Sequence, residues 1–174
     1  MKLVTKKIKN ALEKIKISQK KLARSINYSH GALSSIINGE EAFPIHIIEK
    51  IAPVLEVTVD EVKGWILADA HPKEILELAL KHKNEVKKKK KELILTIQID
   101  SILKQKNMSR TALSKQIKYC QSSLNKMITG KIKLSNTVIE RIAPILEVSE
   151  NEILSWAVAD KYSIEVIELA MTNL

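Results

Sequence analysis

The chain is poor in cysteine, glycine and aromatic residues. Its 174 residues include one cysteine, four glycines and six aromatic side chains. A single cysteine, Cys120, cannot form an internal disulfide and is typical of a protein kept in a reducing cytoplasm. So few glycines leave no Gly-rich loop of the kind that holds nucleotide phosphates. The scarcity of aromatic residues also argues against recognition of single-stranded RNA by base stacking.

The sequence also lacks the patterns of membrane proteins and enzymes. No apolar run approaches the roughly 18 residues of a membrane span, and residues 1–7 lack the apolar core of a secretory leader. No nucleophile is paired with a base, and His46, His71 and His82 share no metal-ligand spacing with Cys120. We therefore expect a cytoplasmic protein that is not an enzyme and uses no metal or cofactor. The three histidines should lie on the surface, and Cys120 should be a small, partly buried side chain.

The positive charge is concentrated in two parts of the chain. The formal net charge is +9, but residues 1–39 alone carry +8 and residues 96–130 carry +5. The segments that follow are acidic, with −4 over residues 40–83 and −3 over residues 131–174. Ordinary scatter of surface charge is one explanation. Because the asymmetry occurs twice, we favour a face that binds a polyanion such as nucleic acid.

The chain contains an internal repeat with an offset of 91 residues and no gap. Residues 5–83 align with residues 96–174, and 26 of the 79 pairs are identical. The densest match joins Ile48–Val57 to Ile139–Val148. A gapless repeat of this length indicates two copies of one small domain rather than a solenoid. The predicted organisation is a first domain at 1–83, a Lys-rich linker at 84–95 and a second domain at 96–174.

The apolar residues recur with helical spacing, which predicts an all-α protein of five to six helices in each domain. Ile8, Leu12 and Ile15 share one helix face, for example. Gly39 and Gly130 follow the third helix of each copy, where a residue with positive φ commonly ends a helix. Further signals are the prolines near the end of the fourth helices (Pro53, Pro144) and the capping boxes that begin the fifth helices (Thr58–Glu61, Ser149–Glu152). Sixth helices are predicted over residues 73–83 and 164–172.

Two features allow more than one interpretation. Trp65 and Trp156 occupy equivalent places and should pack in the cores, with a contact between domains or in a homodimer as the alternative. The apolar stripe of each sixth helix could serve the core or dimerisation. In the linker, Lys87–Lys91 form a solvated face or a diffuse phosphate contact. Residues 73–106 contain no glycine or proline, so we favour a helical linker over the strand suggested by alternation in residues 93–99.

A family resemblance emerges at the short second and third helices. Residues 17–26, which include Ser18, Gln19, Leu22 and Ala23, resemble the second helix of Cro/repressor-type, lambda-repressor-like helix-turn-helix domains. Residues 27–39 resemble the turn and recognition helix that follow. The resemblance extends over nearly all of each copy and implies a tandem DNA-binding transcriptional regulator of bacterial or phage type, associated with the nucleoid. Its partner would be double-stranded DNA, with recognition helices in successive major grooves about 34 Å apart.

The resemblance also implies which residues contact DNA. The tips of the recognition helices would contact base edges, while the start of the second helix, the position after the third helix and nearby cations would contact phosphates. The implied base contacts are His30, Gly31, Ala32, Ser35, Gln121, Ser122, Ser123 and Lys126. The implied phosphate contacts are Gln19, Lys20, Lys21, Arg24, Asn38, Arg110, Lys115, Thr129, Lys131 and Lys133.

The two copies depart from the family pattern in different ways. Asn27 and Lys118 stand where the turn usually has glycine, and Lys tolerates a left-handed φ less well than Asn, so the second turn could differ slightly. Cys120 is a poor N-cap beside its counterpart Ser29. Gln121 can pair with adenine and Lys126 can contact guanine. We therefore hypothesise that copy two supplies more base recognition, and copy one more charge from Lys6, Lys7, Lys20, Lys21 and Arg24.

A rival interpretation is a protein-interaction module that has kept this fold. Antitoxins and anti-repressors are proteins of this kind, and Glu40 and Glu41 after the first recognition helix would disfavour nearby phosphates. Such a protein would bind DNA weakly and without sequence preference, and would bind one protein partner tightly. RNA binding is a third option.

Overall fold

The computed structural model describes residues 2–86 and 93–174, which form twelve α-helices and no strand. Within those residues, no helix is long and apolar enough to cross a membrane. The helices are α1 (Leu3–Lys14), α2 (Gln19–Ser25), α3 (His30–Asn38), α4 (Ile45–Val54), α5 (Val59–Ala70), α6 (Lys73–Val86), α7 (Ile94–Gln105), α8 (Arg110–Gln116), α9 (Gln121–Ile128), α10 (Asn136–Leu146), α11 (Glu150–Lys161) and α12 (Ile164–Met171). The all-α prediction is confirmed.

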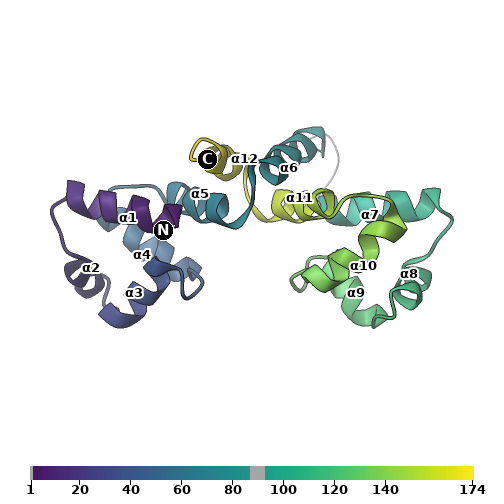
Figure 1. The fold of residues 1–174 in the computed structure, drawn as a ribbon, viewed down its shortest axis with the longest axis horizontal. Coiled ribbons are helices and arrows are strands. Elements are labelled where there is room, and N and C mark those ends of the chain that lie inside the picture. Colours follow the sequence, from purple (N-terminus) through teal and green to yellow (C-terminus); the bar gives the residue numbers. More distant parts are fainter. Residues whose placement is uncertain (1, 87–92) are drawn as a thin grey trace. The chain divides into compact units, whose positions relative to one another are not determined.

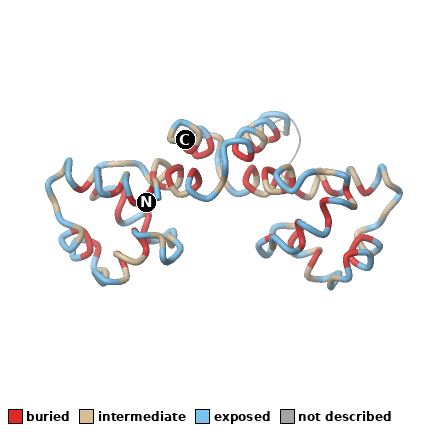
Figure 2. The backbone as a smooth tube through the Cα atoms, viewed as in Figure 1, coloured by how far each residue is buried: buried red, intermediate tan, exposed pale blue. Residues whose placement is uncertain are grey.

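In the first compact unit, five helices enclose one apolar core. Helix α1 packs on α3 and α5, α2 packs on α3 and α4, and α4 packs on α5 (Figure 1). Buried residues recur along one side of each helix (Figure 2). Ile8, Leu22, Leu33 and Ile51 are fully buried in this core, and Trp65 is 7% exposed. Burial of each such side chain contributes about 1.5–3 kcal/mol, which is why the apolar spacing in the sequence predicts these contacts.

The second unit repeats this arrangement with α7 to α11. Helix α7 packs on α9, α10 and α11, and α8 packs on α9. Ile99, Leu113, Leu124 and Ile142 are fully buried at the positions equivalent to those of the first core, and Trp156 is 1% exposed. The prediction that both tryptophans pack in the cores is confirmed.

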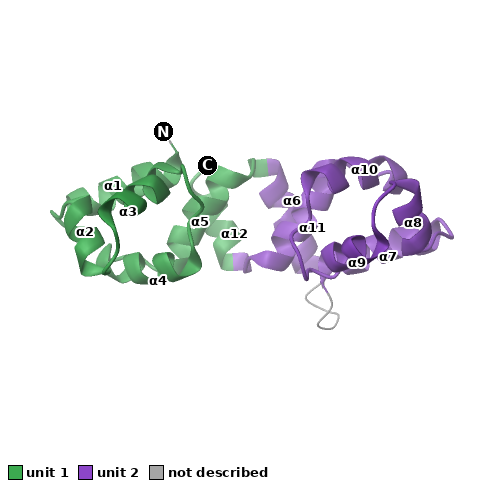
Figure 3. Cartoon of the chain, turned by 90° about the horizontal axis from the view of Figure 1, so that it is seen from below, with its two compact units in different colours: residues 1–73, 165–174 green, residues 74–164 purple. Residues whose placement is uncertain are grey.

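The compact units do not follow the order of the repeats. One unit contains residues 1–73 together with 165–174, and the other contains residues 74–164 (Figure 3). Helix α6, which follows the first repeat, therefore belongs to the second unit beyond its first residue. Helix α12, which ends the second repeat, belongs to the first unit from Glu165 onward. The predicted domains were drawn from sequence similarity alone, which cannot tell which copy of a helix packs on which copy of a core.

Each sixth helix has its own means of packing. In the first unit α12 lies close to α5, since a Cβ built on Gly64 would come within 2.9 Å of the Leu169 Cβ and 3.3 Å of the Ala170 amide. In the second unit the counterpart of Gly64 is Ser155, which is fully buried and donates to the Glu152 carbonyl. The apolar stripe of each sixth helix is buried, as expected for a core-facing helix.

Most local helix signals are confirmed. Gly39 and Gly130 adopt φ values of 78° and 68° after the third helix of each unit. Thr58 and Glu61 form both bonds of the predicted capping box. Only half of the second box forms among the described residues: Ser149 accepts from the Glu152 amide, but the Glu152 carboxylate lies beside a histidine of α6 instead.

The linker is only partly described. Residues up to Val86 continue α6, and α7 begins at Ile94, which confirms helix rather than strand over residues 94–99. Leu93 has extended angles (φ −65°, ψ 138°), so one continuous helix over residues 73–106 does not form. The predicted lysine face at residues 87–91 lies outside the described residues.

An aspartate far along the chain caps the first helix of each repeat. The residues that precede α1 and α7 make no side-chain cap. Instead, the Asp69 carboxylate accepts from the Leu3 and Val4 amides at 2.7 and 2.8 Å. Asp160 accepts from the amides of Ile94 and Leu95 at 2.6 and 3.0 Å in the same way. These bonds satisfy amides that a helix start leaves without partners, and they join α1 to α5 and α7 to α11.

The Asp160 cap can be tested by substitution. Burial raises the pKa of Asp160, an effect that the two amides oppose. Asp160→Ala removes both acceptors from partly buried amides, so we expect the free energy of unfolding to fall by about 1–3 kcal/mol in urea titrations. Glu140→Ala, on the exposed side of α10, is the control and should stay within about 0.5 kcal/mol of the parent. Equal stability of Asp160→Ala and the parent would show that the cap contributes nothing.

Candidate nucleic-acid interface

In the first unit, α2 and α3 form a close pair that leaves the start of α3 exposed. Ser18 caps α2 by accepting from the Lys21 amide, and Ala23 is 1% exposed where the two helices meet. Asn27 takes a left-handed φ of 53° in the turn between them. On the opposite face of α3, Thr5 of α1 donates to the Ile37 carbonyl. The back of α3 is therefore fixed, and its first turn faces solvent.

The second unit builds the same pair. Ser109 caps α8, and Ser114 is 2% exposed at the crossing with α9. Lys118 adopts φ 51°, nearly the value of Asn27, so the expected difference between the two turns does not occur. The surrounding contacts therefore impose a left-handed conformation on a residue that seldom adopts it. Thr96 of α7 donates to the Ile128 carbonyl and fixes the back of α9.

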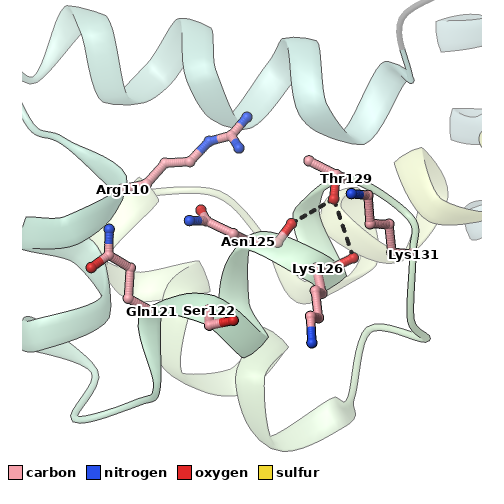
Figure 4. Close-up of a pocket in the computed structure, with 7 residues that line it drawn as sticks. All are labelled: Arg110, Gln121, Ser122, Asn125, Lys126, Thr129 and Lys131. Atoms are coloured by element: carbon pink, nitrogen blue, oxygen red, sulfur yellow. Dashed lines mark hydrogen bonds between the residues drawn. The ribbon is translucent and has the colours of Figure 1, made fainter.

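A polar pocket of about 500 Å³ lies between α8 and the exposed side of α9 (Figure 4). Six of its seven lining residues are predicted DNA contacts on the second unit, and the seventh, Asn125, was not predicted. Asn125 follows Gln121 by four residues and so shares its helix face, a signal that the sequence did contain. The lining residues are Arg110, Gln121, Ser122, Asn125, Lys126, Thr129 and Lys131.

Side-chain bonds fix two of these residues before any ligand binds. The Arg110 guanidinium donates to the Asp100 carboxylate of α7, with Nε–Oδ1 and Nη2–Oδ2 distances of 2.7 and 2.5 Å. Five N–H bonds radiate from a guanidinium, so three remain for another acceptor. Gln121 Nε2 donates to Thr111 Oγ1 at 2.6 Å. Among the described residues no other hydrogen bond of the Gln121 amide is seen, which leaves its oxygen and one N–H for a ligand, the pair that adenine requires.

The equivalent surface of the first unit lacks these side-chain pairs. Lys9 and Gln19 replace Asp100 and Arg110, so no ion pair can form at that place. Gln19 Nε2 is buried without a hydrogen-bond partner among the described residues. Asn38 Nδ2 donates to Ser34 Oγ at a long 3.4 Å.

Two families match the chain where these helix pairs lie. Residues 8–62 match a helix-turn-helix family, and residues 98–158 match the Cro/C1-type HTH DNA-binding domain. The chain carries two Cro/C1-type helix-turn-helix domains in tandem. No curated protein and no solved structure matches it. The family resemblance found in the sequence is confirmed for both copies.

The helix-turn-helix geometry places most predicted DNA contacts in solvent. Among the base contacts, Ala32, Ser35 and Ser123 are half-buried and the others are exposed. Among the phosphate contacts, Gln19, Arg110 and Thr129 are half-buried. Thr129 Oγ1 donates to the Asn125 carbonyl at 2.7 Å, so its hydroxyl is already engaged. The exposed phosphate contacts are Lys20, Lys21, Arg24, Asn38, Lys115, Lys131 and Lys133.

Two predictions about single residues were wrong. Cys120 is exposed instead of partly buried. It is the N-cap residue of recognition helix α9, and the start of this helix protrudes into solvent. His82 is buried, with 7% of its surface exposed, instead of lying on the surface. Its burial depends on α11, which lies about seventy residues along the chain and has no local signal near His82.

The position of Cys120 also affects its acidity. Its thiol makes no capping hydrogen bond, but the amides at the start of α9, from Ser123 and Ser122, lower the pKa of the thiol. The positive end of the helix favours the thiolate in the same sense.

This acidity can be measured by alkylation. We expect the rate of iodoacetamide modification of Cys120 to rise with a midpoint below pH 9.0, the ordinary value, in the folded protein. In urea the midpoint should move upward, because the helix amides no longer favour the thiolate. The chain has one cysteine, so the signal needs no correction for other thiols. Identical midpoints in the two conditions would contradict the effect of the helix start.

Proposed function

We propose that this protein is a sequence-specific regulator of transcription that binds double-stranded DNA, is associated with the nucleoid in the cytoplasm, and has no catalytic role. The observation that carries the proposal is the exposed polar tip of α3 and of α9, each held by a buried apolar back. A helix presented in this way fits the roughly 12 Å width of the major groove. The basic front halves of both repeats would supply attraction to phosphates.

Two linked recognition helices support binding to a two-part operator. In this proposal α3 and α9 enter successive major grooves, about 34 Å apart. Because the tips differ at every position, the preferred site would be an imperfect repeat. A homodimer would bring four recognition helices to a longer operator.

Selection of bound duplexes from a random DNA library, at about 150 mM salt, tests the proposal. We expect enrichment of a two-part motif with fixed spacing. Affinity should fall steeply with salt, with a logarithmic slope of about −0.9 for each phosphate contact. Retention without any enriched sequence would contradict sequence-specific regulation. It would favour the protein-interaction module, for which exposed Glu40 and Glu41 beside the end of α3 are the supporting feature.

We further propose that the second domain contributes more base recognition than the first. Gln121 is oriented by Thr111 and can form two bonds to adenine, while Lys126, five residues further along α9, is exposed and lines the same pocket. At the equivalent places the first domain has His30 and Ser35, which offer fewer donors for bidentate pairing.

Alanine substitutions at matched positions test this difference. Gln121→Ala with Lys126→Ala should weaken binding to the selected operator by about 1–3 kcal/mol per lost base contact and relax preference at one half-site. His30→Ala with Ser35→Ala, the same two places in the other repeat, is the matched variant and should cost clearly less. Affinities are best measured by fluorescence anisotropy on the operator and a scrambled duplex. If Gln121→Ala with Lys126→Ala left the sequence preference intact, and His30→Ala with Ser35→Ala abolished it, the assignment would be reversed.

A further inference from the structure

Helix α6 is joined to α11 by a buried pair of aromatic side chains. The Trp156 indole N–H donates to His82 Nε2 at 3.0 Å, and this bond is buried. The two rings meet edge to face, with centroids 6.0 Å apart and an interplanar angle of 76°. Ile75, Leu76 and Ala79 of α6 are also buried. The polar pair therefore lies near the C-terminal end of a helix whose earlier turns include buried apolar side chains.

The bond to Trp156 fixes the state of the histidine. An indole N–H can only donate, so Nε2 must act as an acceptor and the proton of the neutral ring lies on Nδ1. His82 Nδ1 is buried and has no hydrogen-bond partner among the described residues. The nearest carboxylate oxygen described for it is Oε2 of Glu85, at 3.8 Å. Among the residues that the structure describes, the ring is thus held through one nitrogen only.

We propose that the His82–Trp156 pair is a pH-sensitive latch that holds α6 on α11 and opens when His82 is protonated. Protonation places a hydrogen on Nε2, so two donors face each other and the buried indole N–H loses its acceptor. The Glu152 carboxylate of α11 lies 3.7 Å from Nε2 and offers the charged ring another acceptor. Donating to that carboxylate would move the ring away from Trp156.

The charged groups around His82 act in opposite directions. Glu152 on α11 and Glu85 on α6 favour the protonated ring, while Lys81 on α6 opposes it. Burial outweighs the two carboxylates and lowers the pKa of His82 from its ordinary 6.5. The folded state therefore binds fewer protons here than the unfolded state. The stability that this site supplies is complete above pH 6.5 and is lost as the pH falls through that value toward the lower pKa of the folded protein.

The first unit contains a natural control. At the equivalent position, two residues after the end of α12, the chain has Asn173, which does not titrate and whose Nδ2 donates to the Leu169 carbonyl of α12. The residue after it is Leu174, with 58% of its surface exposed, where α6 has Lys83. Lys83 Nζ donates to the Ala159 and Tyr162 carbonyls at the end of α11. Acid should therefore loosen α6 while leaving α12 in place.

Hydrogen–deuterium exchange of the full chain at about pH 7.5 and about pH 5.5, corrected for intrinsic rates, tests the latch. We expect peptides of residues 74–86 to exchange about tenfold faster at the lower pH, and those of residues 164–171 to change little. His82→Gln keeps an acceptor for Trp156 but cannot be protonated, so its α6 should show no such response. An equal response of α6 and α12, or an unchanged response in His82→Gln, would overturn the proposal.

A second measurement follows the titration in the unaltered chain. Proton NMR of the unaltered chain resolves two indole N–H signals, one from Trp156 and one from Trp65. We expect the Trp156 signal to shift along a single titration with a midpoint below pH 6.5, and the Trp65 signal to stay constant. Trp156→Phe assigns the signals. A Trp156 signal that does not move between about pH 7.5 and the acid unfolding limit would contradict the latch.

Discussion

The exposed tips of the recognition helices depend on burial of the opposite sides of those helices. Leu33 and Ile37 on α3 are fully buried, as are Leu124 and Ile128 on α9. In each repeat, a threonine of the first helix also donates to a main-chain carbonyl in the last turn of the recognition helix, and this bond fixes that turn. A short helix is unstable on its own. These contacts on one side therefore make it possible to present polar residues on the other.

The two helix-turn-helix domains, called heads below, share a scaffold of buried residues but differ in their polar surface. The scaffold residues are identical or similar at an offset of 91, whereas the tips differ at each position. In the second head, side chains of α7 and α8 hold Arg110 and Gln121 in place. Ordering a long side chain in advance lowers the entropy lost on binding. The second head is thus organised before contact with a ligand, while the first has charge without comparable side-chain order.

Helices α5 and α11 each serve several contacts at once. Asp160 of α11 caps α7, and Trp156, one turn earlier on the same helix, holds His82 of α6. Asp69 of α5 caps α1, and Gly64 of the same helix allows close packing of α12. Because each sixth helix belongs to the unit built by the other repeat, neither repeat contains all the residues of one compact unit. The repeat boundary and the unit boundary are separate properties of this chain.

The sequence by itself determined the helices, most of their ends and the family. The signals for them are the apolar spacing, the glycines Gly39 and Gly130 that follow helices, and the Thr58 capping box. These signals depend on residues close together in the chain, so they can be recognised from the sequence. It also placed the tips of α3 and α9 in solvent. Only the tertiary structure decided in which compact unit α6 and α12 pack, that His82 is buried and that Arg110 pairs with Asp100. Those contacts join residues from ten to more than seventy positions apart, and no local spacing encodes which of two similar partners a helix meets.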